Sequence, residues 1–345
     1  MTETSGDLRV GIVGVGAMGA DHAERVAHRV SGARLVAVSD ADAARAGDLA
    51  ARFPGVRAVT DPLALVADDD VDAVVVASPG AAHEEQVLAC LEAGKHVLCE
   101  KPLTMDGESS LRVVRAERAA GRPLVQLGFM RRFDPEYARL KAVLDSGRLG
   151  RMLLLHNTHR NKSVPDTFRS EMIVRDSLVH EVDVARFLFG EEITEVTVYS
   201  PAPTSAAAEG VVDPQVSVFR MQGGAVVTNE VFVTNQVGYE VRCEAVCERG
   251  SAMAGRPWAD LYTTVAADDG EGLWGGGVPA DFLGRFARAY DLELQAWADA
   301  SRRGEVVGPT TWDGYAATVV CEAGMRSLTT GEPASVTLVD PGPAS

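Results

Sequence analysis

The sequence predicts an α/β domain with a parallel sheet, followed by an α+β domain with a large, mostly antiparallel open sheet. The chain has 345 residues, more than one ordinary hydrophobic core accommodates. Up to residue 130, short apolar runs alternate with helical patterns, as in parallel βαβ units. From residue 193 to 247, strand-like segments follow one another without helices, which is typical of antiparallel pairing. We therefore expect one domain over residues 1–130 and a second over 131–345, with C-terminal helices that can pack back on the first.

The first domain is predicted to alternate strands and helices. The apolar run Ala73–Ala77 fits a strand buried on both faces of the sheet. The expected strands are Leu8–Val13, Arg34–Ser39, Ala73–Ala77, His96–Cys99 and Pro123–Gly128. The expected helices are Ala17–Val30, Ala41–Arg52, Ala81–Glu92 and Gly107–Ala120.

The second domain is predicted to contain one amphipathic helix over residues 175–189 and then a run of strands. Gln222-Gly223-Gly224 fits a hairpin turn, and the glycine-rich segment Asp268–Pro279 is expected to be a mobile loop. Other expected helices cover 135–146, 281–303 and 311–329. The expected strands are 150–161, Glu195–Ser200, Gln215–Met221, Ala225–Thr234 and Tyr239–Val246.

Composition narrows the class of partner and compartment. The net charge of −16 argues against nucleic acid and anionic membrane surfaces as partners. No apolar run reaches the roughly 18 residues of a membrane span, and Met1–Asp7 lacks the basic and apolar parts of a signal peptide, so we expect a cytoplasmic protein. The five cysteines contain no CxxC pair, which favours buried free thiols over a disulfide framework or a zinc site.

The segment Gly14-Val15-Gly16-Ala17-Met18-Gly19 follows an apolar strand and opens a helical pattern. In this context GxGxxG is the fingerprint of a dinucleotide-binding Rossmann domain. The first glycine permits the tight turn, the second lets the backbone approach a pyrophosphate, and the third allows close packing of helix and strand. The helix N-terminus would supply N–H donors to the phosphates, so we assign Gly14, Gly16, Ala17, Met18 and Gly19 to the cofactor site.

Asp40 stands at the end of the second expected strand, 21 residues after Gly19. A carboxylate there binds the adenine-ribose hydroxyls and repels a 2′-phosphate. No basic residue follows before Arg45, so the sequence favours NAD over NADP. The alternative role for Asp40 is that of a helix N-cap, and both roles are compatible.

Glu100-Lys101-Pro102 follows an apolar strand in a chain with only four lysines. Lysine, unlike arginine, can lose its proton when buried, so Lys101 is a candidate for proton transfer. The alternative is a surface lysine at a strand end. Ser78 ends the preceding strand, and the carboxyl ends of parallel strands share one edge of the sheet, so both residues are expected near the cofactor.

Asp176 and His180 are four residues apart in the expected helix 175–189 and would share one face. A carboxylate beside an imidazole suits a general acid/base near neutral pH. The alternatives are an N-cap for Asp176 and a structural histidine. Asp183 would extend the pair to a helical metal site, but an NAD enzyme with a lysine needs no metal.

Two further segments carry donors suited to a polyhydroxylated ligand. Gly128-Phe129-Met130-Arg131-Arg132-Phe133 follows the last strand of the first domain, and His159-Arg160-Asn161 ends the first strand of the second. Arg131 and Arg132 would also suit recognition of a carboxylate, or salt bridges between the domains.

Together these segments resemble the Gfo/Idh/MocA oxidoreductase family, and within it the inositol dehydrogenase branch, from about Leu8 to Thr329. The Glu-Lys-Pro and Asp-xxx-His elements are common to the family, whereas Met-Arg-Arg, His-Arg-Asn and Gly-Tyr look like that branch. The resemblance rests on Gly14–Gly19, Asp40, Glu100–Pro102, Gly128–Phe133, His159–Asn161, Asp176–Asp183, Gly238–Glu240 and Asp291–Gln295.

The resemblance implies a catalytic set of Lys101, Asp176 and His180, in which His180 takes the substrate hydroxyl proton and Lys101 polarises the oxygen. It also implies a cis Lys101-Pro102 bond and a homotetramer formed through the outer face of the open sheet. The further expected residues are Ser78, Glu100 and Lys101 for NAD and Met130, Arg131, His159, Asn161 and Tyr239 for the substrate.

The implied reaction is NAD-dependent oxidation of a ring hydroxyl of a cyclitol, with myo-inositol as the first expectation. Scyllo-inositol or an aminocyclitol of an antibiotic pathway is the close alternative. The run Trp274-Gly275-Gly276-Gly277 departs from the pattern expected of catabolic inositol dehydrogenases. A non-catalytic NAD-binding sensor on the same scaffold is the remote alternative. Such a protein is expected to have lost the catalytic residues, whereas Lys101, Asp176 and His180 are all present here.

Overall fold

The computed structural model describes residues 6–255, 263–264, 273–274 and 279–342. The chain forms two compact units. Unit 1 comprises Met1–Met130, Ala289–Thr318 and Val339–Ser345, and unit 2 comprises Arg131–Arg288 and Val319–Leu338. The expected second domain, 131–345, therefore includes two segments that belong to unit 1.

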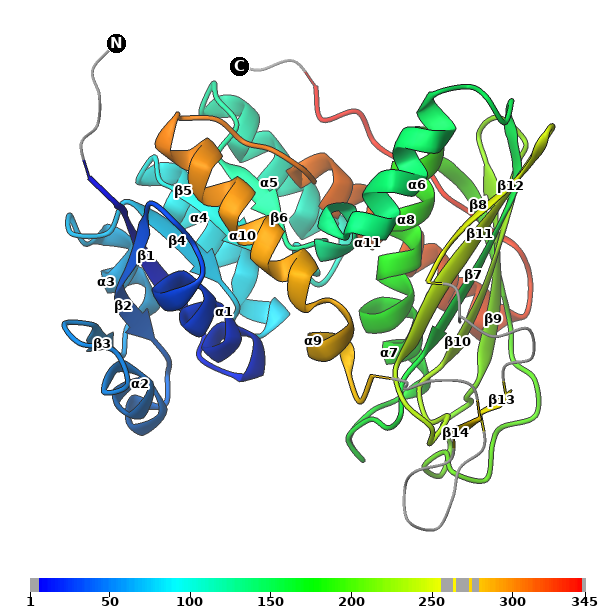
Figure 1. Cartoon of the computed structure of the whole chain (residues 1–345), viewed down its shortest axis with the longest axis horizontal. Helices are drawn as coiled ribbons and strands as arrows, with labels where there is room; N and C mark the ends of the chain where they lie inside the picture. The colour runs from blue at the N-terminus through cyan, green and yellow to red at the C-terminus, as the bar shows by residue number, and fades with distance from the viewer. Residues whose placement is uncertain (1–5, 256–262, 265–272, 275–278, 343–345) are drawn as a thin grey trace. The chain divides into compact units, whose positions relative to one another are not determined.

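Unit 1 is built on a six-stranded parallel sheet in the order β3-β2-β1-β4-β5-β6 (Figure 1). The order reverses between β1 and β4, and in open α/β sheets ligands bind at such a switch point, beyond the carboxyl ends of the strands. The strands are β1 (Leu8–Val13), β2 (Ala33–Ser39), β3 (Arg57–Val59), β4 (Ala73–Val76), β5 (His96–Cys99) and β6 (Val125–Leu127).

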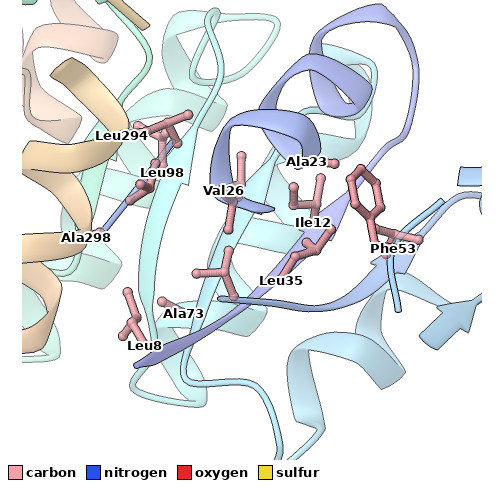
Figure 2. Close-up of a cluster of buried hydrophobic side chains, with 14 of the residues drawn as sticks. Leu8, Ile12, Ala23, Val26, Leu35, Phe53, Ala73, Leu98, Leu294 and Ala298 are labelled. Carbon is pink, nitrogen blue, oxygen red and sulfur yellow. The ribbon is translucent and has the colours of Figure 1, made fainter. Parts of the chain in front are cut away.

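A hydrophobic core on one face of this sheet joins strands β1, β2, β4 and β5 to helices from both ends of the chain (Figure 2). Val26 of α1 and Leu294 and Trp297 of α10 are buried in it, which explains why α10 belongs to unit 1. The helices of unit 1 are α1 (Ala17–His28), α2 (Ala43–Ala50), α3 (Pro62–Ala67), α4 (His83–Glu92), α5 (Gly107–Ala119) and α10 (Ala287–Arg302), with the short turn η1 (Gly80–Ala82). The helix α11 (Thr311–Thr330) belongs to unit 1 up to Thr318 and to unit 2 from Val319, and the short turn η2 (Met130–Phe133) belongs to unit 2 from Arg131.

Unit 2 is built on a seven-stranded sheet in the order β12-β11-β7-β10-β9-β8-β15. The pair β7–β10 is parallel and the other pairs are antiparallel, which confirms the predicted mostly antiparallel sheet. The strands are β7 (Met152–Arg160), β8 (Ile193–Tyr199), β9 (Gln215–Met221), β10 (Val226–Phe232), β11 (Glu240–Cys247), β12 (Gly250–Ala254) and β15 (Ala334–Ser335). A separate pair joins β13 (Thr263–Thr264) to β14 (Leu273–Trp274).

Helices α6 (Pro135–Asp145) and α8 (Val179–Phe189) lie against one face of the unit 2 sheet (Figure 1). Buried and half-buried residues alternate along β10 and β11, as expected when one face is packed and the other is open. Between α6 and α8 the chain forms β7, the short helix α7 (Ser170–Met172) and the π-helical turn η3 (Ile173–Leu178).

Several details differ from the predicted elements. The single helix expected over 175–189 is η3 followed by α8, and the helix expected over 281–303 is divided into α9 (Phe282–Arg285) and α10. The glycine-rich loop Asp268–Pro279 lies almost entirely outside the described residues. All five cysteines are buried free thiols, as predicted. Among the described helices, none combines the length and the apolar character that crossing a membrane requires.

Candidate functional site

The glycine-rich turn joins β1 to α1. Gly14 has φ of +84°, and a Cβ atom at this position would overlap the backbone of Ser78. A Cβ on Gly19 would overlap the carbonyl oxygen of Gly14, whereas one on Gly16 would meet nothing within 4 Å. Packing therefore requires glycine at two of these positions, and the third borders open space. Gly16 is the N-cap of α1 and provides no side-chain cap, so the first turn, with Ala17 and Met18, can direct its N–H groups to an anion.

Asp40, at the carboxyl end of β2, is held by the backbone. Its two carboxylate oxygens accept hydrogen bonds from the N–H groups of Val15 and Asp42, each at 2.9 Å. Partial burial acts to raise the pKa of Asp40, but these two N–H donors and Arg45, whose Nη1 lies 3.6 Å from Asp40 Oδ2, together outweigh it and lower the pKa. The side chain that caps α2 is that of Asp42, not Asp40. An ionised, fixed carboxylate beside the glycine turn fits the adenine-ribose hydroxyls of NAD.

Ser78 lies on the loop after β4. Its hydroxyl donates to Gln86 Oε1 at 2.6 Å, and its carbonyl oxygen lies 2.8 Å from His83 Nε2. The other ring nitrogen of His83 lies 2.8 Å from the carbonyl oxygen of Pro102. His83, which sequence reasoning missed, therefore connects this loop to the segment that carries Lys101.

Glu100 is buried at the end of β5 and supports that segment from inside. Its Oε1 lies 2.8 Å from His22 Nε2, and its Oε2 accepts the backbone N–H of Lys101 at 3.2 Å. Burial acts to raise the pKa of Glu100, but the interactions with His22 and Lys101 together outweigh it and lower the pKa. The Lys101-Pro102 bond is cis, which confirms the prediction. Because His22 belongs to α1, the helix of the glycine turn and the backbone of Lys101 are joined through one carboxylate.

Asp176 lies in the π-helical turn η3, and His180 lies in the first turn of α8. Single π turns within helices are frequent at functional sites. The Asp176 carboxylate accepts hydrogen bonds from Nε and Nη2 of Arg175, at 2.7 and 2.8 Å. The side-chain hydrogen bond to Asp176 raises the pKa of Arg175. His180 is buried, with its ring edge-on to that of His159 at a centroid distance of 6.2 Å.

Arg131, His159, Tyr239 and Glu181 form a buried cluster in unit 2, which we call the Glu181 cluster. Glu181 and Arg131 form an ion pair, and Glu181 Oε2 lies 3.1 Å from His159 Nδ1. Burial acts to raise the pKa of Glu181, but Arg131 and His159 overcome it and lower the pKa to about 2. Burial raises the pKa of Tyr239, whose ring lies edge-on to His159 at 5.6 Å. The sequence predicted three of these residues and missed Glu181.

Met130 and Asn161 complete the predicted substrate residues. Met130 is buried at the start of η2. The main chain of Asn161 bonds to Phe232 and Asn235, while its Oδ1 atom is buried without a hydrogen-bond partner among the described residues. A buried acceptor of this kind is suited to a ligand hydroxyl, because an unsatisfied buried polar atom is costly.

In the helix suggested as a metal site, the Asp183 carboxylate is paired with an arginine. Asp183 is buried and accepts hydrogen bonds from Nε and Nη2 of Arg132, the latter at 2.6 Å. In the part of the chain that the structure describes, no three His, Cys, Asp or Glu side chains are grouped so that they could hold a metal ion.

Comparison with known proteins gives two family matches along the chain. Residues 8–129 match the family model described as the oxidoreductase family with an NAD-binding Rossmann fold, and residues 137–253 match the GFO/IDH/MocA C-terminal domain. The chain belongs to the GFO/IDH/MocA oxidoreductase family. It is 53% identical over 335 residues to the inositol 2-dehydrogenase of Mycolicibacterium gilvum (strain PYR-GCK), which covers 97% of this chain and 95% of that relative. The inositol 2-dehydrogenase of Mycolicibacterium smegmatis is 52% identical, with 97% of each chain covered.

Solved structures give the same result for this member of the family. Myo-inositol dehydrogenase from Lactobacillus casei, in complex with NAD(H) and myo-inositol, superposes with a TM-score of 0.89 and 33% identity, covering 97% of this chain and 98% of that one. Scyllo-inositol dehydrogenase from the same organism, with NAD(H) and scyllo-inositol, gives a TM-score of 0.85 and 26% identity, with coverages of 95% and 99%. The chain is thus an NAD-dependent oxidoreductase of this family.

Proposed function

We propose that this protein is an NAD-dependent inositol 2-dehydrogenase that oxidises myo-inositol to its 2-keto derivative. The observation that carries the proposal is the near-complete coverage by relatives of that name at 52–53% identity. The local geometry supports it, because the glycine turn and Asp40 fit NAD, and the Glu181 cluster and Asn161 carry polar groups suited to a polyol.

Separate residues of the chain would bind the cofactor and carry out the proton transfer. The first turn of α1 would hold the pyrophosphate, and Asp40 would hold the adenine ribose. When bound, NAD accepts the hydride that leaves the carbinol carbon. His180 would remove the hydroxyl proton, Lys101 would hold and polarise the same oxygen, and Asp176 would keep the pair in the required charge state.

The charges of unit 2 favour a neutral cyclitol over an aminocyclitol. An ammonium group that leaves water requires a carboxylate partner. Every carboxylate between residues 173 and 189 already faces a guanidinium, in the pairs Asp176–Arg175, Glu181–Arg131 and Asp183–Arg132. The aminocyclitol reading would therefore need a carboxylate from elsewhere in the chain.

The test is the initial rate of NADH formation at 340 nm with myo-inositol, scyllo-inositol and an aminocyclitol in parallel, each with NAD and with NADP. We expect myo-inositol and NAD to give the highest kcat/KM. Turnover of the aminocyclitol alone would overturn the substrate proposal, and no turnover of any cyclitol would overturn the function. Activity that persists after chelation would exclude the metal-site reading.

We also propose that the protein forms a homotetramer through the outer face of the unit 2 sheet. The face of the sheet opposite the helices carries half-buried apolar side chains, namely Val218, Val226 and Phe232. On the same face, Arg160 forms an ion pair with Glu230. Native mass spectrometry of the wild type and of Val218→Asp tests this. We expect tetramers and a smaller species respectively, and a monomeric wild type would contradict it.

A further inference from the structure

Glu181 uses its two carboxylate oxygens for two different partners. Oε1 accepts a hydrogen bond from Nη1 of Arg131, and Oε2 lies 3.1 Å from Nδ1 of His159 on β7. The side chains of all three residues are at most 4% exposed. A purely structural ion pair would need only the first contact, so the second one calls for an explanation.

The contact with Glu181 determines where the proton of His159 lies. A carboxylate is only an acceptor, and Glu181 stays ionised because Arg131 lies beside it. For a hydrogen bond to exist, Nδ1 of His159 must carry the proton. Arg131 Nη2, 3.3 Å from the same Nδ1, then faces a donor and makes no hydrogen bond to it. Neutral His159 is therefore the Nδ1–H tautomer.

This tautomer leaves Nε2 of His159 with a free lone pair. The two ring nitrogens of an imidazole point in nearly opposite directions, so Nε2 is directed away from Glu181. The rings of His180 and Tyr239 lie edge-on to the His159 ring, at 6.2 and 5.6 Å. A hydroxyl that reaches Nε2 must donate its hydrogen, as a ring hydroxyl of a cyclitol can.

We propose that Glu181 is a positioning residue for substrate recognition: it fixes His159 as the Nδ1–H tautomer, so that Nε2 accepts a hydrogen bond from a substrate hydroxyl. Arg131 keeps Glu181 in the acceptor form. This inference rests on the proposed function for the identity of the ligand, but the tautomer itself is a property of the protein alone.

Glu181→Gln tests the inference because it reverses the proton pattern. The amide oxygen of Gln accepts from Arg131, so its NH2 group faces His159 and requires Nδ1 to be an acceptor. His159 then becomes the Nε2–H tautomer and presents a donor where the wild type presents a lone pair. Glu117→Gln is the matched control, since Glu117 is also buried but bonds to Leu124, Val125 and Thr311.

The first measurement is solid-state ¹⁵N NMR of histidine-labelled protein without substrate. The chain has seven histidines, and His159→Ala identifies the signal of interest by its loss. We expect protonated Nδ1 and unprotonated Nε2 in the wild type and in Glu117→Gln, and the reverse in Glu181→Gln. A wild-type His159 protonated at Nε2 alone would overturn the proposal whatever substrate the enzyme uses, and it needs no variant to fold.

The second measurement is steady-state kinetics after wild-type turnover of myo-inositol has been established. We expect Glu181→Gln to raise the KM for myo-inositol at least tenfold and to leave the KM for NAD within twofold. In a His159→Ala background the same substitution should have no further effect, because Glu181 acts through His159. If the increases in KM of the two single substitutions multiply in the double variant, Glu181 does not act through His159 and the positioning role is overturned. If Glu181→Gln does not fold, Glu181→Asp keeps the charge but shortens the reach to His159, and an unchanged KM in that variant would count against the proposal.

Discussion

Lowering the pH should remove the stabilisation that unit 2 gains from ionised Glu181. Burial works against the charged form, yet Arg131 and His159 lower the pKa of Glu181 from 4.5 to about 2. A carboxyl whose pKa is lower in the folded state stabilises that state above its unfolded pKa. The stabilisation is therefore complete above about pH 5 and is lost as the pH falls towards 2.

The magnitude follows from this pKa difference. A lowering from 4.5 to about 2 corresponds to about 3 kcal/mol of stabilisation, all of which is lost once the pH is far below both values. The same relation gives a loss of about 1 kcal/mol at pH 4 and about 2 kcal/mol at pH 3. Both values are large compared with the few tenths of a kcal/mol that a surface carboxylate typically contributes.

The assay is urea unfolding of the wild type and of Glu181→Gln between pH 6 and pH 3. Hydrogen exchange of the β7 amides monitors the unfolding of unit 2. The difference in unfolding free energy between the two proteins cancels every other carboxylate. We expect this difference to shrink by about 2 kcal/mol across the range. A difference that stays constant, or that grows as the pH falls, would refute the reasoning.

Three further predictions concern unit 1. Lys101→Met should lower kcat/KM by about 10²- to 10⁴-fold while calorimetry still detects NAD binding, and unchanged kcat/KM would remove Lys101 from the chemistry. Gly19→Ala should lower the melting temperature because its Cβ overlaps Gly14, whereas Gly16→Ala should keep the wild-type melting temperature and weaken NAD binding at least tenfold; equal melting temperatures for the two variants would contradict this packing argument. His22→Ala should cost about 3–5 kcal/mol in urea unfolding, because it leaves the buried Glu100 carboxylate without this side-chain partner, and a loss below about 1 kcal/mol would contradict this role of His22.

The sequence predicted the strands of unit 1 well because buried parallel strands are continuous apolar runs. The strands Leu8–Val13 and His96–Cys99 have the predicted bounds. The edge strand β3 and the short helix α3 were missed, since three largely exposed residues and one and a half turns carry too little periodicity to detect. The cis bond at Lys101-Pro102 was predicted from the family resemblance rather than from the residues.

A motif does not show how its side chains are paired, so the sequence left the contacts of the predicted site residues open. The spacing of Asp176 and His180 assumed one regular helix, but η3 is a π turn, and no residue pattern in this segment distinguishes it from an α-helix. Asp40 was open to two roles, and only the structure shows that Asp42 caps α2 instead. His22 and His83 were missed because their partners lie 78 and 19 residues away in the chain.

Arg131 shows most clearly what a sequence leaves undetermined. In a donor-rich segment, an arginine looks available to a ligand. Its side chain is 2% exposed, however, and burial of a guanidinium is tolerated only with a carboxylate partner, which here lies 50 residues away on α8. The counter-charge that Arg131 requires is one of the acids of Asp176–Asp183, namely Glu181, next to the predicted His180. The proton position on His159 then follows from hydrogen-bond chemistry, so the acceptor that we propose for the substrate hydroxyl depends on the buried charge of Glu181.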